Sequence, residues 1–234
     1  MADAPTAAPP RAVIFDADGV LVDSYRAHFE AWKAMGRELG MDLAEETFAG
    51  TFGRRNEDLM HDLWGDAVAP EDIPAWSDWK EATYREILLR DFTAMDGAGE
   101  LIDALRAADF RLAVGSSGPP ENVAVCIQGL ERAGAFDATV DGAQVTRGKP
   151  DPEVFLTAAA KLGVAPSRCA VVEDAVAGVE AARRAGMAAV GLTGTTTREA
   201  LAPRADRVVD SLRDLSPERI AALIDEHGPE WPGG

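Results

Sequence analysis

Short apolar runs alternate with amphipathic stretches along most of the chain. The first run is rich in residues that favour strands, and the runs predict buried strands at residues 12–15, 111–114, 138–140, 170–172, 188–192 and 207–209. Between the later runs, apolar residues recur at three- and four-residue spacing, which predicts helices at residues 99–108, 121–133, 153–162, 176–185 and 217–225. This alternation favours an α/β fold with a parallel sheet covered by helices on both faces.

The pattern is different between the first and the second of these strands. Apolar residues take helical spacing after Ser24, a predicted N-cap, and Gly40 ends this stretch. Two more helices are predicted at residues 56–64 and 71–90, with no strand pattern between residues 24 and 91. We therefore predict a discontinuous core domain of residues 11–24 and 92–226, an all-helical cap domain of residues 25–91, and flexible ends at residues 1–10 and 228–234.

Composition and charge narrow the possible functions. The 234 residues are 47% hydrophobic, which suffices for a sizeable core, and the net charge of -17 disfavours nucleic acid and anionic membranes as partners. No apolar run is long enough to span a membrane. Cys126 and Cys169 fall in a helical and a strand pattern, so we expect buried thiols in a reducing, cytoplasmic setting. We expect a monomer, because no heptad or symmetric feature indicates self-association.

Two carboxylates follow the first predicted strand. Asp16 and Asp18 are two residues apart, so at the end of a strand they face the same side, and Gly19 permits a sharp turn. Two neighbouring carboxylates repel each other, and a shared proton, a basic side chain or a hard cation has to compensate. The alternative interpretation is a polar turn, which these residue types also form.

Other strand ends and nearby loops carry further polar side chains. These are Ser116 and Ser117, Lys149, and Glu173 with Asp174. Each has an ordinary explanation, namely a Ser/Gly turn, a solvated loop lysine, and acids at a helix N-terminus. Ligands of open α/β sheets nevertheless bind at the carboxyl ends of the strands, where these residues are expected to converge. The acids favour Mg²⁺, and a lysine, a hydroxyl and a metal together suit a phosphoryl group.

These residues, in this order, resemble the four motifs of the haloacid-dehalogenase superfamily, in its branch with a helical cap after the first strand. The matching segments are residues 16–24, 114–116, 149–150 and 173–174 followed by Gly178. The resemblance covers about residues 11–225 and implies a Rossmann-like core. It also implies that Asp16 is the nucleophile, which forms an aspartyl-phosphate, and that Asp18 is the general acid and base, a residue that the dehalogenases lack.

The resemblance implies roles for the remaining motif residues. Phosphoryl binding would fall to Ser116, Ser117 and Lys149. The Mg²⁺ ligands would be Asp16, the backbone carbonyl of Asp18, Asp174, and Glu173 either directly or through water.

The cap is similar to that of the β-phosphoglucomutase branch at His28, Arg54 and Lys80. In that branch the histidine lies near the cap hinge, the arginine binds the second phosphate of the substrate, and the lysine contacts the substrate. In this chain His28 has a second interpretation as a satisfied polar residue on a helix, and Arg54 has one as a surface charge.

The chain departs from the mutases just after Ser116. Where the mutases have residues that grip the distal phosphate, this chain has Gly118, Pro119 and Pro120, and a proline offers neither an N–H donor nor a charge. We therefore predict a phosphatase of a small phosphorylated metabolite such as a sugar phosphate. The alternatives are a β-phosphoglucomutase-type mutase and, more remotely, a non-catalytic protein that binds metal or phosphate.

Overall fold

The computed structural model describes residues 9–49 and 56–227. Arg54 and most of the predicted flexible ends lie outside these residues. The strands form one six-stranded parallel sheet in the order β3-β2-β1-β4-β5-β6, so β1 lies inside it between β2 and β4. The strands are β1 Ala12–Phe15, β2 Arg111–Gly115, β3 Ala138–Val140, β4 Cys169–Glu173, β5 Ala188–Leu192 and β6 Arg207–Val209. The predicted α/β fold is confirmed.

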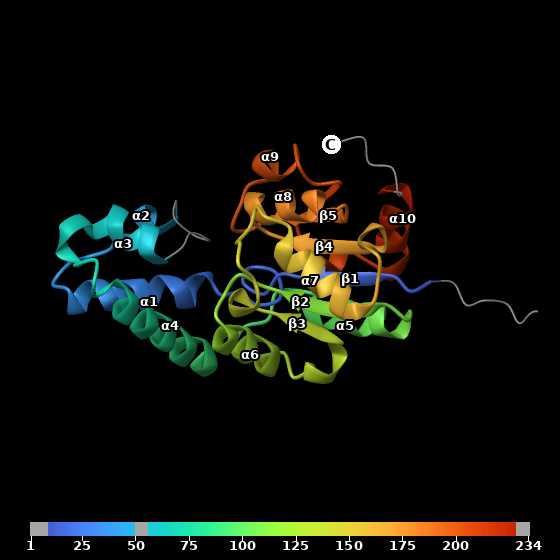
Figure 1. Ribbon diagram of the computed structural model, residues 1–234. Coiled ribbons are helices and arrows are strands. Elements are labelled where there is room, and N and C mark those ends of the chain that lie inside the picture. The colour runs from blue at the N-terminus through green and yellow to red at the C-terminus, as the bar shows by residue number, and fades with distance from the viewer. Residues whose placement is uncertain (1–8, 50–55, 228–234) are drawn as a thin grey trace, which may run out of the picture.

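Helices surround this sheet and also form a group to one side of it (Figure 1). They are α1 Tyr25–Glu38, α2 Glu45–Ala49, α3 Asn56–Trp64, α4 Ile73–Arg90, α5 Ala98–Ala107, α6 Pro120–Gly129, α7 Glu153–Leu162, α8 Val176–Arg184, α9 Arg198–Leu201 and α10 Pro217–His227. Short 3-10 turns occur at Gly65–Ala67, Ala133–Ala135, Gly142–Gln144, Pro166–Arg168 and Leu212–Asp214.

Each face of the sheet packs against its own set of helices. One hydrophobic cluster joins Val13 and Phe15 to apolar side chains of α5, α6 and α10. A second cluster joins Ala12 and Ile14, which point the opposite way, to side chains of α7, α8 and α9. All four residues of β1 are fully buried, which explains why this strand reads as an uninterrupted apolar run.

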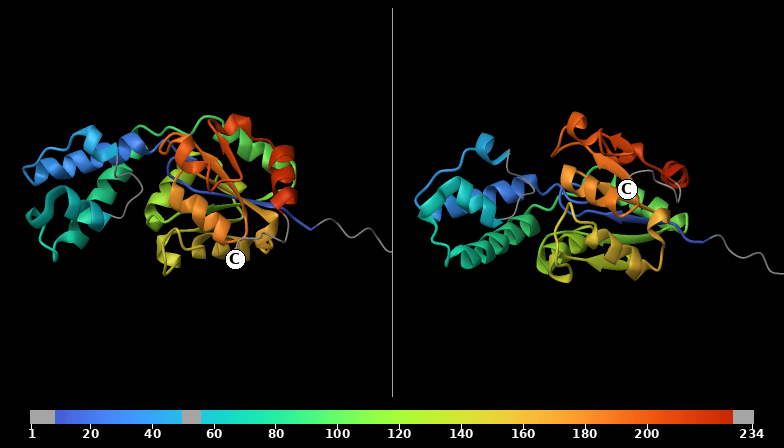
Figure 2. Two further views of the ribbon diagram at one scale, coloured as in Figure 1. Left: turned by 90° about the horizontal axis from the view of Figure 1, so that it is seen from above. Right: turned by 45° about the horizontal axis from the view of Figure 1, so that its top comes forward.

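The helices α1 to α4 have a hydrophobic cluster of their own. It contains the tryptophans Trp32 and Trp64 with Phe29, Phe48 and Leu59, all buried. Figures 1 and 2 show these helices standing beside the end of the sheet, with α4 reaching back toward α6.

The far end of α4 is shared with the sheet. Its residues Tyr84 and Leu88 belong to the cluster that packs on β1 and β2. Ala27 and Ala31 of α1 belong to the same cluster, so α1 and α4 both connect the helical group to the core. The domain boundaries at residues 24–25 and 91–92 stay a prediction.

The observed helices include two that were not predicted and one that ends earlier than predicted. The segments α2 and α9 were not predicted, since five and four residues are too short for a periodic pattern. Helix α6 ends at Gly129 instead of residue 133, because Glu131 takes the left-handed conformation with φ of 55° and cannot continue a helix.

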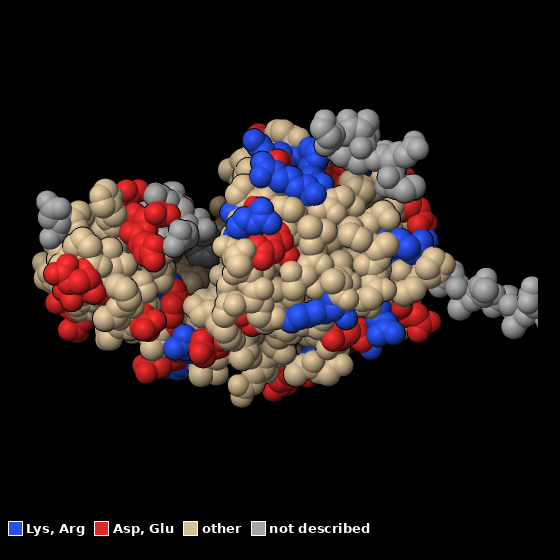
Figure 3. Space-filling model, in the orientation of Figure 1, with Lys and Arg blue, Asp and Glu red and all other residues tan. Residues whose placement is uncertain are grey.

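The surface carries acidic side chains over the α1–α4 group, whereas basic ones gather over α8 and α9 (Figure 3). The arginines of this basic region are paired with acids, since Arg184 and Arg204 contact Glu180 and Arg198 contacts Asp210. Within residues 9–49 and 56–227, no helix combines the length and the apolar character needed to cross a membrane.

Candidate active site

The predicted site residues follow the carboxyl ends of neighbouring strands. Phe15 of β1 is in register with Val114 of β2 and with Val172 of β4, so the next residues of all three strands emerge at one edge of the sheet. The backbone N–H of Asp16 donates to the carbonyl of Val172 at 3.0 Å, and that of Ser116 donates to Val140 of β3 at 3.0 Å. Parallel pairing thus carries both residues to the same edge.

Three buried carboxylates meet at this edge. Ligand oxygens of Asp16, Glu173 and Asp174 all lie within 4.8 Å of one another. The loop after β3 brings in Lys149, whose Nζ donates to Asp16 Oδ1 at 2.6 Å and to Glu173 Oε1 at 2.7 Å. The ammonium group also lies 4.9 Å from the ring centroid of Phe155. One lysine therefore faces three acids, which leaves an excess of negative charge in the cluster.

Burial and mutual repulsion govern the protonation of these acids. Burial raises the pKa of Asp16 to about 7, opposed by Lys149 and reinforced by Glu173. Burial and the charges of Glu173 and Asp16 raise the pKa of Asp174 well above its ordinary value. Burial alone would lower the pKa of Lys149, but the two carboxylates that it contacts outweigh burial and raise it, so the lysine stays charged.

The carboxylate of Glu173 is fixed from two sides. Its Oε1 accepts from Lys149, and its Oε2 accepts from the backbone N–H of Ala175 at 2.7 Å. Gly178 of α8 makes room for it, because a Cβ at this position would lie 1.7 Å from Glu173 Oε1. Both oxygens thus have protein donors, which favours an indirect role for Glu173 at a metal and leaves Asp174 as the freer ligand.

Asp174 contacts two residues from other segments. The hydroxyl of Thr195, in the loop after β5, donates to Asp174 Oδ2. On its other side lies Gly19, where a Cβ would come within 2.1 Å of the same oxygen and 2.9 Å of Thr195 Oγ1. Gly19 also has φ of 73°, so both its conformation and its lack of a side chain are needed there.

Asp18 turns away from this cluster toward the helical group. Its Oδ1 accepts a hydrogen bond from Tyr84 Oη of α4 at 2.7 Å and lies 3.4 Å from His28 Nε2 of α1. Burial tends to raise the pKa of Asp18, but the contacts with His28 and Tyr84 prevail and lower it. In this arrangement Asp18 is an ionised acceptor, whereas the general-acid role that the resemblance implies requires a protonated Asp18. The hydrogen bonds from the helical group account for the ionised state.

The histidine beside Asp18 has an assignable proton. Lys80 Nζ lies 2.9 Å from His28 Nδ1, and because an ammonium group only donates, Nδ1 accepts and Nε2 carries the proton toward Asp18. Burial and the charge of Lys80 lower the pKa of His28, which favours this neutral tautomer. The imidazole also stacks on the Tyr84 ring, with centroids 3.9 Å apart.

The two predicted phosphate-binding serines lie differently. Ser116 is 3% exposed, and its Oγ accepts from the backbone N–H of Gly118 at 3.0 Å. A Cβ on Gly118 would lie 3.3 Å from this oxygen and 4.0 Å from Asp18 Oδ2, so Ser116 and Asp18 flank Gly118. Ser117 is exposed. The geometry therefore associates Ser116 with the cluster, and a role for Ser117 stays a prediction.

A second polar group lies where α4 contacts α6. Glu81 Oε1 accepts from Lys80 Nζ at 2.9 Å and from Asn56 Nδ2 at 2.8 Å, while its Oε2 accepts from Asn122 Nδ2 at 2.7 Å. Asn122 Oδ1 in turn accepts from Arg85 Nη1 at 2.9 Å. Lys80 and Asn122 are each 2% exposed. This network joins helices α3, α4 and α6.

The chemistry of the acid cluster fits a hard divalent cation. Its donors are carboxylate oxygens, the ligands that Mg²⁺ prefers, and a cation would remove the repulsion that raises the pKa values of Asp16 and Asp174. The three acids and Lys149 were all predicted from the sequence, and the structure brings them together. His28 lies beside Asp18, Lys80 contacts His28 on its other ring nitrogen, and Arg54 is outside the described residues.

Several residues of the site had no assigned role from the sequence alone. They are Tyr84, Glu81, Asn56 and Thr195. The positions 81, 84, 85 and 88 follow the spacing of one helix face, which was the available signal for α4. Thr195 lies in a loop, where no period exists to indicate it.

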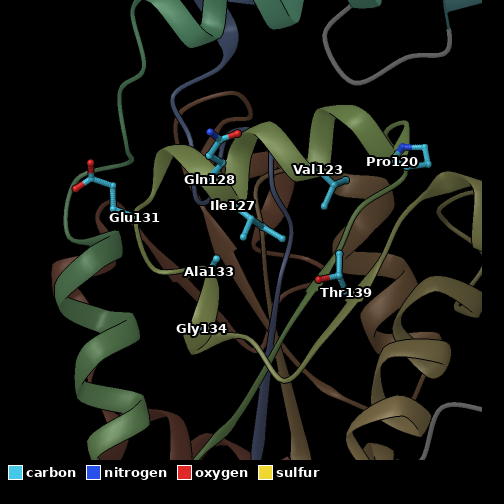
Figure 4. A pocket seen from close by; sticks show the side chains of 9 residues that line it. Pro120, Val123, Ile127, Gln128, Glu131, Ala133, Gly134 and Thr139 are labelled. Carbon is cyan, nitrogen blue, oxygen red and sulfur yellow. The ribbon is translucent and has the colours of Figure 1, made fainter.

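A separate surface pocket lies along the side of α6 (Figure 4). Val123 and Ile127 of α6 line it together with Thr139 of β3. None of the predicted site residues contributes to it. The acid cluster and this pocket are therefore distinct places in the molecule.

Comparisons with known proteins agree with this geometry. A family model described as haloacid dehalogenase-like hydrolase matches residues 10–186. The chain is 33% identical over 192 residues to a β-phosphoglucomutase of Bacillus subtilis (strain 168), covering 78% of this chain and 83% of that protein. It is 34% identical over 212 residues to a validoxylamine A 7'-phosphate phosphatase of Streptomyces hygroscopicus subsp. limoneus, covering 88% and 95%. A solved HAD hydrolase of family IA, variant 3, from Entamoeba histolytica superposes with a TM-score of 0.85 at 29% identity, covering 92% and 99%.

Proposed function

Because the chain belongs to the haloacid dehalogenase-like hydrolase family, we propose that it is a Mg²⁺-dependent phosphatase of a small phosphorylated metabolite, such as a sugar phosphate. The observation that carries this proposal is the buried cluster of Asp16, Glu173 and Asp174 with Lys149 at the end of β1. Carboxylates, one fixed ammonium group and a nearby hydroxyl are suited to positioning and neutralising a phosphoryl group.

The proposed reaction has two steps. A carboxylate oxygen of Asp16 attacks phosphorus, and the bond between phosphorus and the leaving oxygen breaks as Asp18 delivers a proton to that oxygen. Water then attacks the phosphorus of the aspartyl-phosphate and gives its proton to Asp18, which releases inorganic phosphate and restores the Asp16 carboxylate. Since Asp18 is ionised in this arrangement, the first step requires it to gain a proton before the leaving group departs.

Other residues would bind the phosphoryl group and the metal. Lys149 and Ser116 would hold the phosphoryl oxygens, and Ser117 would add a hydroxyl or N–H donor from the exposed part of the loop. Asp16, Asp174 and the carbonyl of Asp18 would hold Mg²⁺, with Glu173 acting through its fixed position. When bound, Mg²⁺ supplies charge neutralisation for the nucleophile and the phosphoryl oxygens.

The surroundings of the site support a phosphatase over a mutase. A mutase must grip the second phosphate of a bisphosphate intermediate. Besides Arg54, the side chains that could replace the missing grip are Asn122 and Arg147. Asn122, two residues after Pro120, is held by Glu81 and Arg85. Arg147 is paired with Asp151 at 3.0 Å and Glu153 at 3.5 Å. These two side chains are thus engaged within the protein itself.

A β-phosphoglucomutase activity is the second candidate. The likeness to the Bacillus subtilis mutase favours it, as does the placement of His28 beside Asp18 and of Lys80 beside His28. In this case Arg54 would bind the distal phosphate. A non-catalytic role in metal or phosphate binding is less favoured, because each catalytic carboxylate is present.

The cellular compartment and the class of partner are also part of the proposal. The free, buried thiols of Cys126 and Cys169 suit a reducing, cytoplasmic compartment. The pairing of the α8–α9 arginines with acids supports a small-molecule substrate over nucleic acid. A monomeric state stays a prediction.

A substrate panel tests the proposal. Purified protein with Mg²⁺ is given sugar phosphates, including β-glucose 1-phosphate with a bisphosphate primer, and both inorganic phosphate and glucose 6-phosphate are measured. We expect phosphate release that stops with EDTA and in Asp16→Asn. Glucose 6-phosphate formed without phosphate release would establish the mutase, and neither product from any compound would refute both enzymes.

A further inference from the structure

We propose that Asn122 is a positioning residue, which holds α4 on α6 so that the Tyr84 hydroxyl stays on the carboxylate of Asp18. This inference rests on the proposed function, in which Asp18 passes the proton. Asn122 touches neither Asp16 nor Asp18 through any recorded hydrogen bond; its two polar atoms both bind residues of α4. Its effect on Asp18 is therefore indirect.

The two contacts of Asn122 bracket Tyr84 along α4. Its Nδ2 donates to Glu81 Oε2 at 2.7 Å, and its Oδ1 accepts from Arg85 Nη1 at 2.9 Å. Glu81 precedes Tyr84 by three residues and Arg85 follows it directly, so positions 81, 84 and 85 share the helix face that meets α6. The side-chain amide of Asn122 thus binds this turn of α4 through two hydrogen bonds, one in which it donates and one in which it accepts.

The burial of the contact makes it more than a surface association. Asn122 is 2% exposed, the Glu81 side chain 12% exposed, and Tyr84 is fully buried. Removing the amide leaves partly buried polar atoms of Glu81 and Arg85 without this partner, a cost that a rotation or shift of α4 would relieve. Such a shift moves Tyr84 Oη, which now lies 2.7 Å from Asp18 Oδ1. This hydrogen bond fixes the orientation of the Asp18 carboxyl, so its loss leaves the carboxyl free to turn away from the leaving oxygen. The effect assigned to Asn122 is on the orientation of Asp18 and not on its pKa.

The direction of each hydrogen bond provides a swap that tests the contact. Asn122→Asp keeps an acceptor for Arg85 but sets a carboxylate against Glu81, so the two repel. Adding Glu81→Gln turns the atom facing position 122 into a donor, while its carbonyl oxygen still accepts from Lys80 and Asn56. In the double variant, residue 81 donates to residue 122 instead of accepting from it, so the hydrogen bond between these positions is restored in the opposite direction. A double-mutant cycle can detect this recovery.

Two substrates with different leaving groups distinguish a specific effect on proton transfer by Asp18 from a general loss of activity. A sugar alcohol needs a proton as it leaves, whereas 2,4-dinitrophenolate leaves without one. The release rates of both leaving groups are measured in single turnovers with excess enzyme and Mg²⁺, which isolates the first step from the hydrolysis of the aspartyl-phosphate. The substrates are 2,4-dinitrophenyl phosphate and the best sugar phosphate of the panel.

We expect Asn122→Asp and Asn122→Ala to slow sugar release about tenfold or more and dinitrophenolate release by less than about threefold, the pattern also expected of Asp18→Asn. The swap Asn122→Asp with Glu81→Gln should recover most of the sugar release. Gln128→Ala, which removes an exposed amide from the same helix, should match the wild type.

Two results would overturn the inference. One is equal loss with both substrates in the single variants, which indicates plain disruption. The other is no loss with either substrate. A wild-type protein that releases neither product from any phosphate refutes the proposed function instead, so the two failures are distinguishable.

Discussion

Thr195 is tied to the proposed metal site although no motif contains it. Its hydroxyl donates to Asp174 Oδ2, and the same oxygen packs against Gly19. Partners that orient a metal ligand commonly change metal affinity when removed. We expect Thr195→Val to weaken Mg²⁺ binding about tenfold, measured by calorimetric titration of the apoprotein.

The matched control for this prediction lies two residues away. Thr197→Val alters an exposed threonine that makes no side-chain capping hydrogen bond at α9, so its Mg²⁺ affinity should equal that of the wild type. Thr195→Ser should retain the affinity, because it keeps the hydroxyl. Unchanged binding in Thr195→Val would show that Asp174 needs no support from this loop.

Gly178 gives a second prediction at the scale of single residues. Alanine in a helix interior is ordinarily favoured over glycine by about 1 kcal/mol. Here a Cβ would displace the Glu173 carboxylate and disturb its contact with Lys149. We expect Gly178→Ala to lower the free energy of unfolding by about 1–3 kcal/mol in urea denaturation.

The comparison variant is Gly134→Ala, whose Cβ would have no atom within 4 Å. Its free energy of unfolding should stay within about 0.5 kcal/mol of the wild type. A Gly178→Ala protein as stable as the wild type would mean that Glu173 relocates without cost.

At the scale of elements, two segments connect the helical group to the sheet and pair with each other. Asp23 N–H donates to the Thr93 carbonyl at 2.9 Å, and Met95 N–H donates to Leu21 at 3.0 Å. The sequence predicts hinges near residues 23–24 and 91–96, because the helical insertion follows the nucleophile directly. These amides therefore report on any closure of the helices over the site.

We expect Mg²⁺ with a fluoride complex that mimics phosphate to slow hydrogen exchange in α1, α4 and these two segments. The physical reason is that closure excludes water from the bound group. Mass spectrometry of peptides covering residues 19–33 and 85–97 measures it. Exchange that is identical with and without the fluoride complex contradicts the closure.

Helices and strands were predictable where the pattern of apolar residues within the segment itself indicates them. All six strands lie where the apolar runs indicated, since burial on both faces leaves β1 and its neighbours uniformly apolar. Helix α4 begins at Ile73 with Pro74 in its first turn, two residues later than predicted. The acids were found because they lie at strand ends, and Lys149 was found because its loop lies near these ends in the predicted sheet. The contacts of Asn122 and Thr195 depend on how distant segments pack, which no local pattern encodes.

At the scale of the whole molecule, the acid cluster should make the free energy of unfolding depend on pH when no metal is bound. The pKa of Asp16 is raised from its ordinary value of 3.8 to about 7, and that of Asp174 is raised in the same direction. The folded protein then binds more protons than the unfolded chain between these values, so its stability falls as pH rises through this window. Lys149 does not contribute here, because it is charged in both states. His28 acts in the opposite direction, because burial and Lys80 lower its pKa, so it adds stability as pH rises toward 6.5 and offsets part of the decrease from the two acids.

We therefore expect the urea midpoint in EDTA to decrease from pH 5 to pH 8. Mg²⁺ binds the ionised acids and should oppose this decrease, increasingly so at the higher pH. Asp16→Asn should flatten the profile in EDTA, because it removes one of the groups that lose a proton. A midpoint in EDTA that rises over this range would contradict the charge balance assigned to the cluster.

The central claim is that Asp16 carries the phosphoryl group during turnover. In the most direct measurement, excess protein is mixed with Mg²⁺ and a sugar phosphate that it hydrolyses, and the reaction is quenched in acid within the first turnover. The site of phosphorylation is then mapped by mass spectrometry of the peptides. We expect a transient phosphoryl group on the peptide that contains Asp16, and no such group in Asp16→Asn. Release of phosphate at full rate with no labelled Asp16 at any time point would contradict it.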